Sequence, residues 1–349
     1  MELNDLVHQT SEWLKGQGPN SEIVMSSRVR LARNLDGMPF SHRASKEKQG
    51  EVIALVRPAI ESSPFLKNSS FFDLNELSSL DRQFLRERHL ISHELAESKG
   101  IRAVVVGEKE LVSLMLNEED HLRLQAIESG LQLMGAWHLV DRIESDLDGK
   151  IKFAFSKEWG YLTACPTNAG TGMRASVMLH LPSLVLTKQI GKILQAIAKL
   201  GLVARGLYGE GTEPLGNYFQ ISNQVTLGQA EEEIIDNIER VIKQIIGHEE
   251  NARRILLSQG RRKFLEDKVF RAYGILKNVR IIDSVETVHL LSALRLGVDL
   301  GLTGDVKRQT LNELLIITQP AHLQKLQGKT LSPAQRDVKR AELIREKLK

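Results

Sequence analysis

The chain has 349 residues, enough for two or three domains of ordinary size. Its 47 Lys and Arg nearly balance 44 Asp and Glu, so the formal net charge of +3 excludes a strongly basic nucleic-acid coat or membrane anchor. Hydrophobic residues make up 42% of the chain, which suffices for a large core, and the single cysteine, Cys165, excludes an internal disulfide.

The N-terminal 15 residues lack the apolar run of a signal peptide, and the longest apolar stretch, residues 175–186, is interrupted and too short to cross a bilayer. We therefore expect a soluble cytoplasmic protein with no membrane or nucleic-acid partner.

The hydrophobic pattern predicts an α/β region first. Residues 5–15 are typical of a short amphipathic helix, and residues 22–33 alternate as a strand with Arg28 and Arg30 on one face. Further helices are predicted at residues 46–60, 121–146, 183–200 and 229–258. Further strands are predicted at residues 101–106, 110–116, 151–155, 174–181, 201–208 and 217–227. The isoleucine-rich stripe of residues 229–258 is expected to close this first domain.

Strand patterns become scarce after about residue 259. Helical patterns recur at residues 261–273, 284–297, 307–317 and 332–347. We therefore expect two domains, an α/β domain over residues 1–256 and an all-helical domain over residues 257–349.

The common nucleotide signatures are missing, since the chain has neither a P-loop nor the H-R-D and D-F-G pair of protein kinases. The G-x-G-x-x-A run at residues 170–175 precedes a strand instead of a helix, which disfavours a dinucleotide fold. His89 and His93 lack the glutamate of a zinc motif, so exposed or capping histidines are favoured over a metal pair. The basic run at residues 261–263 is more typical of a solvated helix face than of a nucleic-acid contact.

Four other segments gather unusual chemistry. Residues 26–34 place several arginines on one strand, and residues 117–123 place three carboxylates beside a histidine and an arginine. Residues 165–176 put the only thiol on a glycine-rich turn, and residues 205–213 form a second such turn with Arg and Glu. Each alone suits an ordinary strand face, helix cap or core cysteine. Together they predict phosphoryl transfer without a P-loop, with arginines on the phosphates and carboxylates on a cationic acceptor.

The order of these segments carries a resemblance to a known family. S-S-R-V-R, N-E-E-D-H-L-R, C-P-T-N-x-G-T-x-x-R-A-S and R-G-x-x-G-E-x-T-E followed by I-S-N span residues 22–250, and in them the chain resembles the phosphagen kinases, or ATP:guanido phosphotransferases. The resemblance implies a mainly antiparallel sheet flanked by helices. The helical domain that precedes the first motif in that family is absent here, and a helical C-terminal region is present instead.

That layout is similar to the branch of the family that phosphorylates arginine side chains in proteins. Two alternatives stay open: a phosphagen kinase acting on a free small guanidine, and a non-catalytic phosphoarginine-binding adaptor.

The resemblance also implies the roles of individual residues. Glu119 and Glu213 would orient the acceptor guanidinium, and one of them would take its proton, while Cys165 would position the non-reacting nitrogens. ATP would be carried with Mg²⁺, held largely by the phosphates and water. The residues that would bind ATP are Ser26, Ser27, Arg28, Val29, Arg30, His93, Arg123, Arg174, Ala175, Ser176, Val177, Met178, Arg205, Gly206, Leu207, Tyr208, Gly209 and Glu210. Tyr208 stands where the family usually has a second arginine, so one phosphate ligand is lost or supplied from elsewhere.

The tail adds a fifth motif, R-D-x-x-R-A, at residues 336–341. In that branch of the family it binds phosphoarginine, which implies an allosteric role for Arg336, Asp337, Arg340 and Ala341. The same resemblance implies protein substrates with exposed or unfolded arginines, which include stress-response repressors, and recognition of the mark by a Clp unfoldase–protease. It also implies a homodimer and an activator protein.

Overall fold

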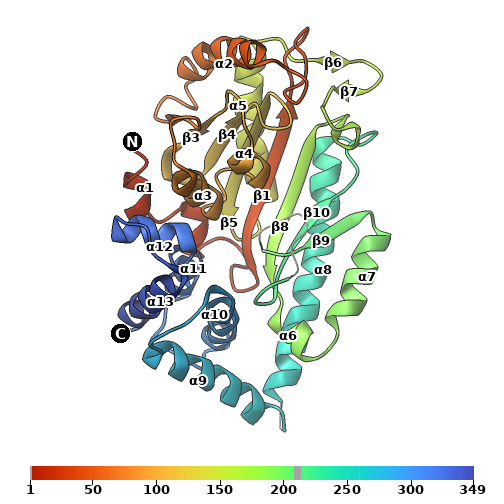
Figure 1. Cartoon of the computed structure of the whole chain (residues 1–349). Helices are drawn as coiled ribbons and strands as arrows, with labels where there is room; N and C mark the ends of the chain where they lie inside the picture. Colours follow the sequence, from red (N-terminus) through yellow and green to blue (C-terminus); the bar gives the residue numbers. More distant parts are fainter. Residues whose placement is uncertain (1, 208–213, 259) are drawn as a thin grey trace.

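The fold is built on one antiparallel sheet, seen in a computed structural model that describes residues 2–207, 214–258 and 260–349 (Figure 1). Within these ranges the main sheet has eight strands in the order β2-β3-β4-β5-β1-β8-β10-β9. They are β1 (Val24–Arg33), β2 (Ser70–Asp73), β3 (Ala103–Val106), β4 (Val112–Leu116), β5 (Leu122–Ser129), β8 (Met173–His180), β9 (Leu202–Arg205) and β10 (Tyr218–Asn223). A separate hairpin joins β6 (Phe155–Ser156) and β7 (Gly160–Tyr161). The expected antiparallel sheet flanked by helices is confirmed.

One face of the sheet is closed by helices. α5 (Leu133–Asp148) and α8 (Glu231–Leu257) pack on β1, β5, β8 and β10, and α2 (Lys46–Glu61) joins the same hydrophobic core. The isoleucine stripe of α8 faces this core, as its 3.6-residue period predicts. α6 (Pro182–Leu186) and α7 (Ile190–Lys199) flank α8 and β9.

On the other face, the described helices cover the two ends of the sheet. α3 (Ser79–Glu87) and α4 (His93–Glu97) pack over β3 and β4, and the C-terminal helices pack beyond the other end of β1. The C-terminal helices are α9 (Arg262–Asn278), α10 (Ser284–Asp299), α11 (Arg308–Ile317), α12 (Pro320–Gln327) and α13 (Pro333–Lys347). Of these, α12 packs against α3 and belongs to the cover over β3 and β4. Between the two covers, the middle of β1 and β8 is left facing a pocket.

The C-terminal helices share a hydrophobic cluster with the sheet. Met25, Met178 and Tyr218 lie in it beside residues of α10, α11 and α13. Trp13 of η1 (Glu12–Lys15) belongs to the same cluster, and α1 (Asp5–His8) contacts α12. The division at residues 256 and 257 stays a prediction.

Some predicted elements differ from the structure. The helix predicted over 121–146 was wrong in its first part, because Leu122, Leu124 and Ala126 alternate into the core from β5. The helix predicted over 183–200 is broken into α6 and α7 near Lys188, which has a φ of 59°. The strand predicted over 151–155 is reduced to β6. β2, α3, α4, α12 and the short turns η2 (Glu108–Glu110) and η3 (Pro166–Asn168) were not predicted.

The helix predicted over residues 5–15 is likewise split, into α1 and η1. In the described ranges, the longest apolar helices fall short of what a bilayer crossing requires.

Candidate active site

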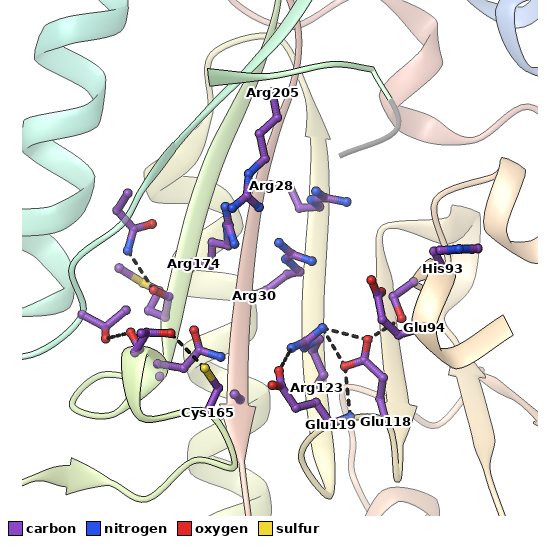
Figure 2. Close-up of a pocket in the computed structure, with 18 of the residues that line it drawn as sticks. Arg28, Arg30, His93, Glu94, Glu118, Glu119, Arg123, Cys165, Arg174 and Arg205 are labelled. Carbon is purple, nitrogen blue, oxygen red and sulfur yellow. Dashed lines mark hydrogen bonds and ion pairs between the residues drawn. The ribbon is translucent and has the colours of Figure 1, made fainter. Parts of the chain in front are cut away.

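A pocket of about 860 Å³ opens over the uncovered middle of the sheet (Figure 2). Its walls carry arginines from four strands, acidic residues from the turn before β5 and the thiol of Cys165. In Figure 2 Arg28, Arg30, Arg174 and Arg205 lie toward one end, while Glu119 and Cys165 lie toward the other. The pocket therefore has a cationic end and an end with acidic and thiol groups.

Strand register brings the arginines together. Arg28 and Arg30 are two residues apart on β1, so their side chains share a face. Arg174 on β8 is directly opposite Arg30, and Arg123 on β5 is opposite Ala32. Like charges placed opposite each other in a sheet destabilise it unless an anion lies between them.

The pKa values of the arginines indicate a site for an anion. Burial, and then the charges of Arg174 and Arg123, lower the pKa of Arg28 to about 10. Burial, and then the charges of Arg28, Arg123 and Arg174, lower the pKa of Arg30 well below its usual value. Among the described residues, no group accepts a hydrogen bond from the buried Nε of Arg28. This end of the pocket is therefore suited to a polyanion such as a nucleoside triphosphate.

Glu118 holds Arg123 in place. Its carboxylate is buried, forms an ion pair with Arg123 at 2.6 Å and accepts a hydrogen bond from the hydroxyl of Ser92. Although burial opposes it, the acidic neighbours, Glu118 first, raise the pKa of Arg123. Glu118 therefore fixes the orientation of Arg123 at the pocket wall, and both of its carboxylate oxygens are already paired.

Glu119 lines the pocket together with Glu94 and Glu118. Its side chain is 42% exposed and lies 3.1 Å from Arg123, which also pairs with Glu118. Burial raises the pKa of Glu119; Arg123 opposes this, and the carboxylates of Asp120 and Glu118 add to the rise. A carboxylate with a raised pKa is a stronger base, which suits proton removal from an acceptor.

Asp120 ties the acidic turn to the cysteine loop. Its buried carboxylate accepts hydrogen bonds at 2.7 Å from the backbone N–H of Ala164 and from the side chain of Asn34. Because Asp120 follows Glu119 and Ala164 precedes Cys165, this one carboxylate fixes the two loops relative to each other.

Cys165 is partly exposed and lines the pocket with Thr167. Its Sγ lies 3.0 Å from the hydroxyl of Thr167, and its carbonyl accepts a hydrogen bond from Thr163. The structure thus brings Glu119 and Cys165 to one pocket. The second predicted carboxylate, Glu213, lies outside the described residues.

The other predicted ATP-binding residues fall into three groups. Arg205 and His93 line the main pocket, His93 as the exposed first residue of α4. A smaller adjoining pocket of about 50 Å³, which shares Arg28 with the main one, is lined in part by Ser26, Ser176, Met178 and Leu207. The side chains of Ser27, Val29, Ala175 and Val177 are buried away from both pockets, and Gly206 lines neither. Tyr208, Gly209 and Glu210 lie outside the described residues.

The tail motif lies on α13, away from the pocket. Arg340 is buried and donates hydrogen bonds to the carbonyls of Thr318 and Ile282 and to the carboxylate of Asp337. Ala341 is buried in the cluster shared with the sheet. Arg336 and Asp337 are partly exposed. The assignment of this motif to phosphoarginine stays a prediction.

Several pocket residues were not found from the sequence. Arg86, Gln220 and Thr226 line the pocket without a motif of their own. Asn223 belongs to the I-S-N segment, and its side chain joins β10 to β8 by accepting from the N–H of Ala175. His89 also lines the pocket, and burial, followed by Arg28 and Arg86, lowers its pKa to about 3.

The described acidic and histidine side chains do not assemble into a metal cage. Across residues 2–207, 214–258 and 260–349, no three His, Cys, Asp or Glu side chains lie close enough together to hold an ion. The arginine-rich end instead suits a metal that arrives bound to phosphates, which is how Mg²⁺ usually enters nucleotide sites.

Comparison with protein families and curated relatives gives a consistent result. The family described as "ATP:guanido phosphotransferase, C-terminal catalytic domain" matches residues 51–252, and "Protein-arginine kinase McsB C-terminal domain" matches residues 262–349. The chain is 52% identical to a protein-arginine kinase of Pelotomaculum thermopropionicum, over 99% of this chain and 98% of that one. It is 48% identical to a protein-arginine kinase of Geobacillus stearothermophilus, over 97% and 94% of the two chains.

Solved structures show the same catalytic fold. The duplicated taurocyamine kinase of Schistosoma mansoni superposes with a TM-score of 0.61 at 27% identity, over 72% of this chain and 36% of that one. A lombricine kinase superposes with a TM-score of 0.60 at 22% identity, over 70% and 72% of the two chains, and this likeness bears on the fold alone.

Proposed function

Because the chain belongs to the protein-arginine kinase family of ATP:guanido phosphotransferases, we propose that it transfers the γ-phosphoryl group of ATP to arginine side chains of proteins. The observation that carries this proposal is the two-ended pocket, in which arginines of neighbouring strands lie toward one end and Glu119 and Cys165 lie toward the other. A polyanion and a guanidinium are the two ligands that such ends would bind side by side.

ATP would lie along the arginine-rich end. Arg28, Arg30, Arg123 and Arg174 would pair with its phosphate oxygens, which relieves the repulsion among the four guanidinium groups. Arg205 would extend the same surface from β9. Mg²⁺, carried by the phosphates and water, would spread the charge that develops on the leaving ADP.

The acceptor guanidinium would lie between Glu119 and Cys165. A guanidinium is a weak nucleophile because it stays protonated at ordinary pH. One nitrogen forms the new N–P bond while the bond from the γ-phosphorus to the ADP oxygen breaks, and the proton lost from that nitrogen passes to Glu119. The Cys165 thiolate would pair with the nitrogens that do not react, and Glu213 would supply a second carboxylate. General-base assistance and alignment of this kind are worth about 10²–10⁴ in rate.

The motif on α13 would bind the phosphoarginine product. Arg340 braces Asp337 by hydrogen bonding, so that Arg336 and Asp337 are held at the surface of α13, where a phosphoarginine would bind and act allosterically. By family resemblance the protein would be a cytoplasmic homodimer served by an activator protein. Its products would include phosphorylated stress-response repressors and proteins degraded by a Clp protease.

The decisive experiment incubates the protein with ATP and either an unfolded protein or free arginine. We expect acid-labile phosphate on arginine of the protein substrate and its loss in Glu119→Gln. Glu128→Gln, on β5 but outside the pocket, is the matched control and should keep full activity. Transfer to the free amino acid alone would favour a small-guanidine kinase. Full activity in Glu119→Gln would show that Glu119 does not accept the proton of the acceptor guanidinium.

A further inference from the structure

Four large hydrophobic side chains lie exposed on segments that border the guanidinium end of the pocket. They are Phe155 (60% exposed), Trp159 (50%), Val225 (49%) and Leu227 (44%). Phe155 and Trp159 belong to the β6–β7 hairpin, and the other two belong to the segment after β10. A single exposed apolar side chain is ordinary, whereas several on adjoining segments beside a pocket are typical of an interaction site.

The two segments meet at the cysteine loop. The N–H of Tyr161 donates to the carbonyl of Gly170 at 2.8 Å, which attaches the hairpin to the loop that begins at Cys165. The hydroxyl of Thr226 donates to the carbonyl of Ala169 at 2.7 Å, which attaches the segment after β10 to the same loop. Gly170 makes this junction possible, because a Cβ there would lie 2.5 Å from the carbonyl oxygen of Thr226.

The hairpin is held firmly. The guanidinium of Arg33 lies 3.4 Å from the centroid of the Tyr161 ring, and that ring packs edge-on against Phe155. The Ser156 hydroxyl accepts hydrogen bonds from the backbone of Glu158 and Trp159, which fixes the turn. The exposed apolar side chains are therefore presented on an ordered support, so binding them would cost little conformational entropy.

This surface continues directly from the pocket. Thr226, which separates Val225 from Leu227, lines the pocket together with Asn168 and Cys165. An arginine of a protein can reach Cys165 only if the chain that carries it lies across the mouth of the pocket. Because Thr226 and the cysteine loop form one side of that mouth, the residues next to the arginine on this side would lie against the segment after β10 and the hairpin.

We propose that Phe155, Trp159, Val225 and Leu227 form an apolar docking rim for the residues that flank the target arginine. This inference rests on the proposed function and specifies its substrate class: arginines beside large apolar residues in unfolded polypeptide. In folded proteins such neighbours are mostly buried, so the rim favours misfolded chains over native ones.

The test compares two peptides of equal length, one with the arginine between leucines and one with it between serines. The wild-type protein should show a kcat/KM roughly five- to tenfold higher for the leucine peptide, the ratio expected when about one apolar side chain is partly buried. In the double variant Trp159→Ser and Leu227→Ser the ratio should fall to about one, while kcat/KM for the serine peptide stays unchanged. Leu55→Ser, which removes an exposed leucine (53%) from α2, is the control and should keep the wild-type ratio.

The outcomes are distinct. Phosphorylation of both peptides with equal efficiency by the wild-type protein would overturn the docking rim and leave the kinase function standing. Phosphorylation of neither peptide would overturn both. Sedimentation of the double variant should match that of the wild type. A change in its oligomeric state with an unchanged peptide ratio would assign the surface to contact between two copies of the chain and overturn the proposal.

Discussion

Replacement of Asp120 tests whether the spacing of Glu119 and Cys165 sets the rate. Asp120 accepts hydrogen bonds at 2.7 Å from Ala164 and Asn34 and is buried. Asp120→Ala leaves the partly buried N–H of Ala164 without its acceptor and leaves the amide of Asn34 with only its bond to the carbonyl of Leu162. Each of the two lost bonds costs about 1–3 kcal/mol. We therefore expect Asp120→Ala to lower the free energy of unfolding by about 2–6 kcal/mol.

Asp120→Asn is the finer perturbation. The amide keeps an oxygen for the two donors but removes the charge that strengthens both bonds, so about 2 kcal/mol of stability should be lost. The turn of Glu119 and the loop of Cys165 would then be less firmly held. A displacement on the order of 1 Å costs about 10² in rate, so kcat should fall about 10- to 100-fold. The KM for ATP should change much less than kcat, because the hydrogen bonds of Asp120 go to Asn34 and Ala164, and Asp120 acts on Arg123 only through its charge.

Urea unfolding and steady-state kinetics against both substrates measure these quantities. Asp148→Asn, on the exposed side of α5, is the control and should leave both unchanged. The reasoning would be refuted by a wild-type kcat in a folded Asp120→Asn protein, or by a rise in the KM for ATP as large as the fall in kcat.

Three further predictions follow from single residues. Because burial raises the pKa of Glu119, its carboxylate takes up a proton at higher pH than an exposed glutamate; kcat/KM should fall as the pH is lowered through that raised pKa, and an acid limb at the ordinary glutamate value of about 4.3 would contradict this. Arg86→Ala should raise the KM for ATP about tenfold and Arg86→Lys less, the difference shrinking at high salt; an unchanged KM in both would exclude Arg86 from the nucleotide site. Arg340→Ala should lower the free energy of unfolding by about 3 kcal/mol in urea, and Arg336→Ala by less than about 1 kcal/mol, since only Arg340 is buried; equal losses would contradict the bracing role.

The sequence pattern alone predicted those elements whose tertiary contacts agree with their local periodicity. The alternation of residues 22–33 predicted β1 and the shared face of Arg28 and Arg30, and the stripe of residues 229–258 predicted α8. β5 was mistaken for helix because its eight residues suit either structure alone. Pairing on both sides, with β4 and β1, decides for the strand.

α12 was not predicted because the contacts that stabilise it come from a distant part of the chain. An eight-residue helix is marginal by itself. Its first N–H groups, on Ala321 and His322, donate to the carboxylate of Glu87 at 2.9–3.0 Å, more than 230 positions away in the chain. No local pattern contains that information.

The residues of the candidate site also fall into those that motifs predicted and those that only the packing reveals. Motifs predicted the arginines, Glu119 and Cys165 as members of one site, and the structure places them around one pocket. The pairing of Glu118 with Arg123, and the presence of Arg86, depend on how α3, α4 and β5 pack, so the sequence left both undetermined.

The hydrophobic cluster shared by the sheet and the C-terminal helices has a consequence for engineering the chain. A truncation after Leu257 would expose Met25, Met178 and Tyr218 to water along with Trp13, and would take Ser292 away from the His180 imidazole that it bonds at 2.8 Å. The truncated catalytic region would therefore tend to aggregate. The C-terminal helices would thus shield its apolar surface from water in addition to carrying the R-D-x-x-R-A motif.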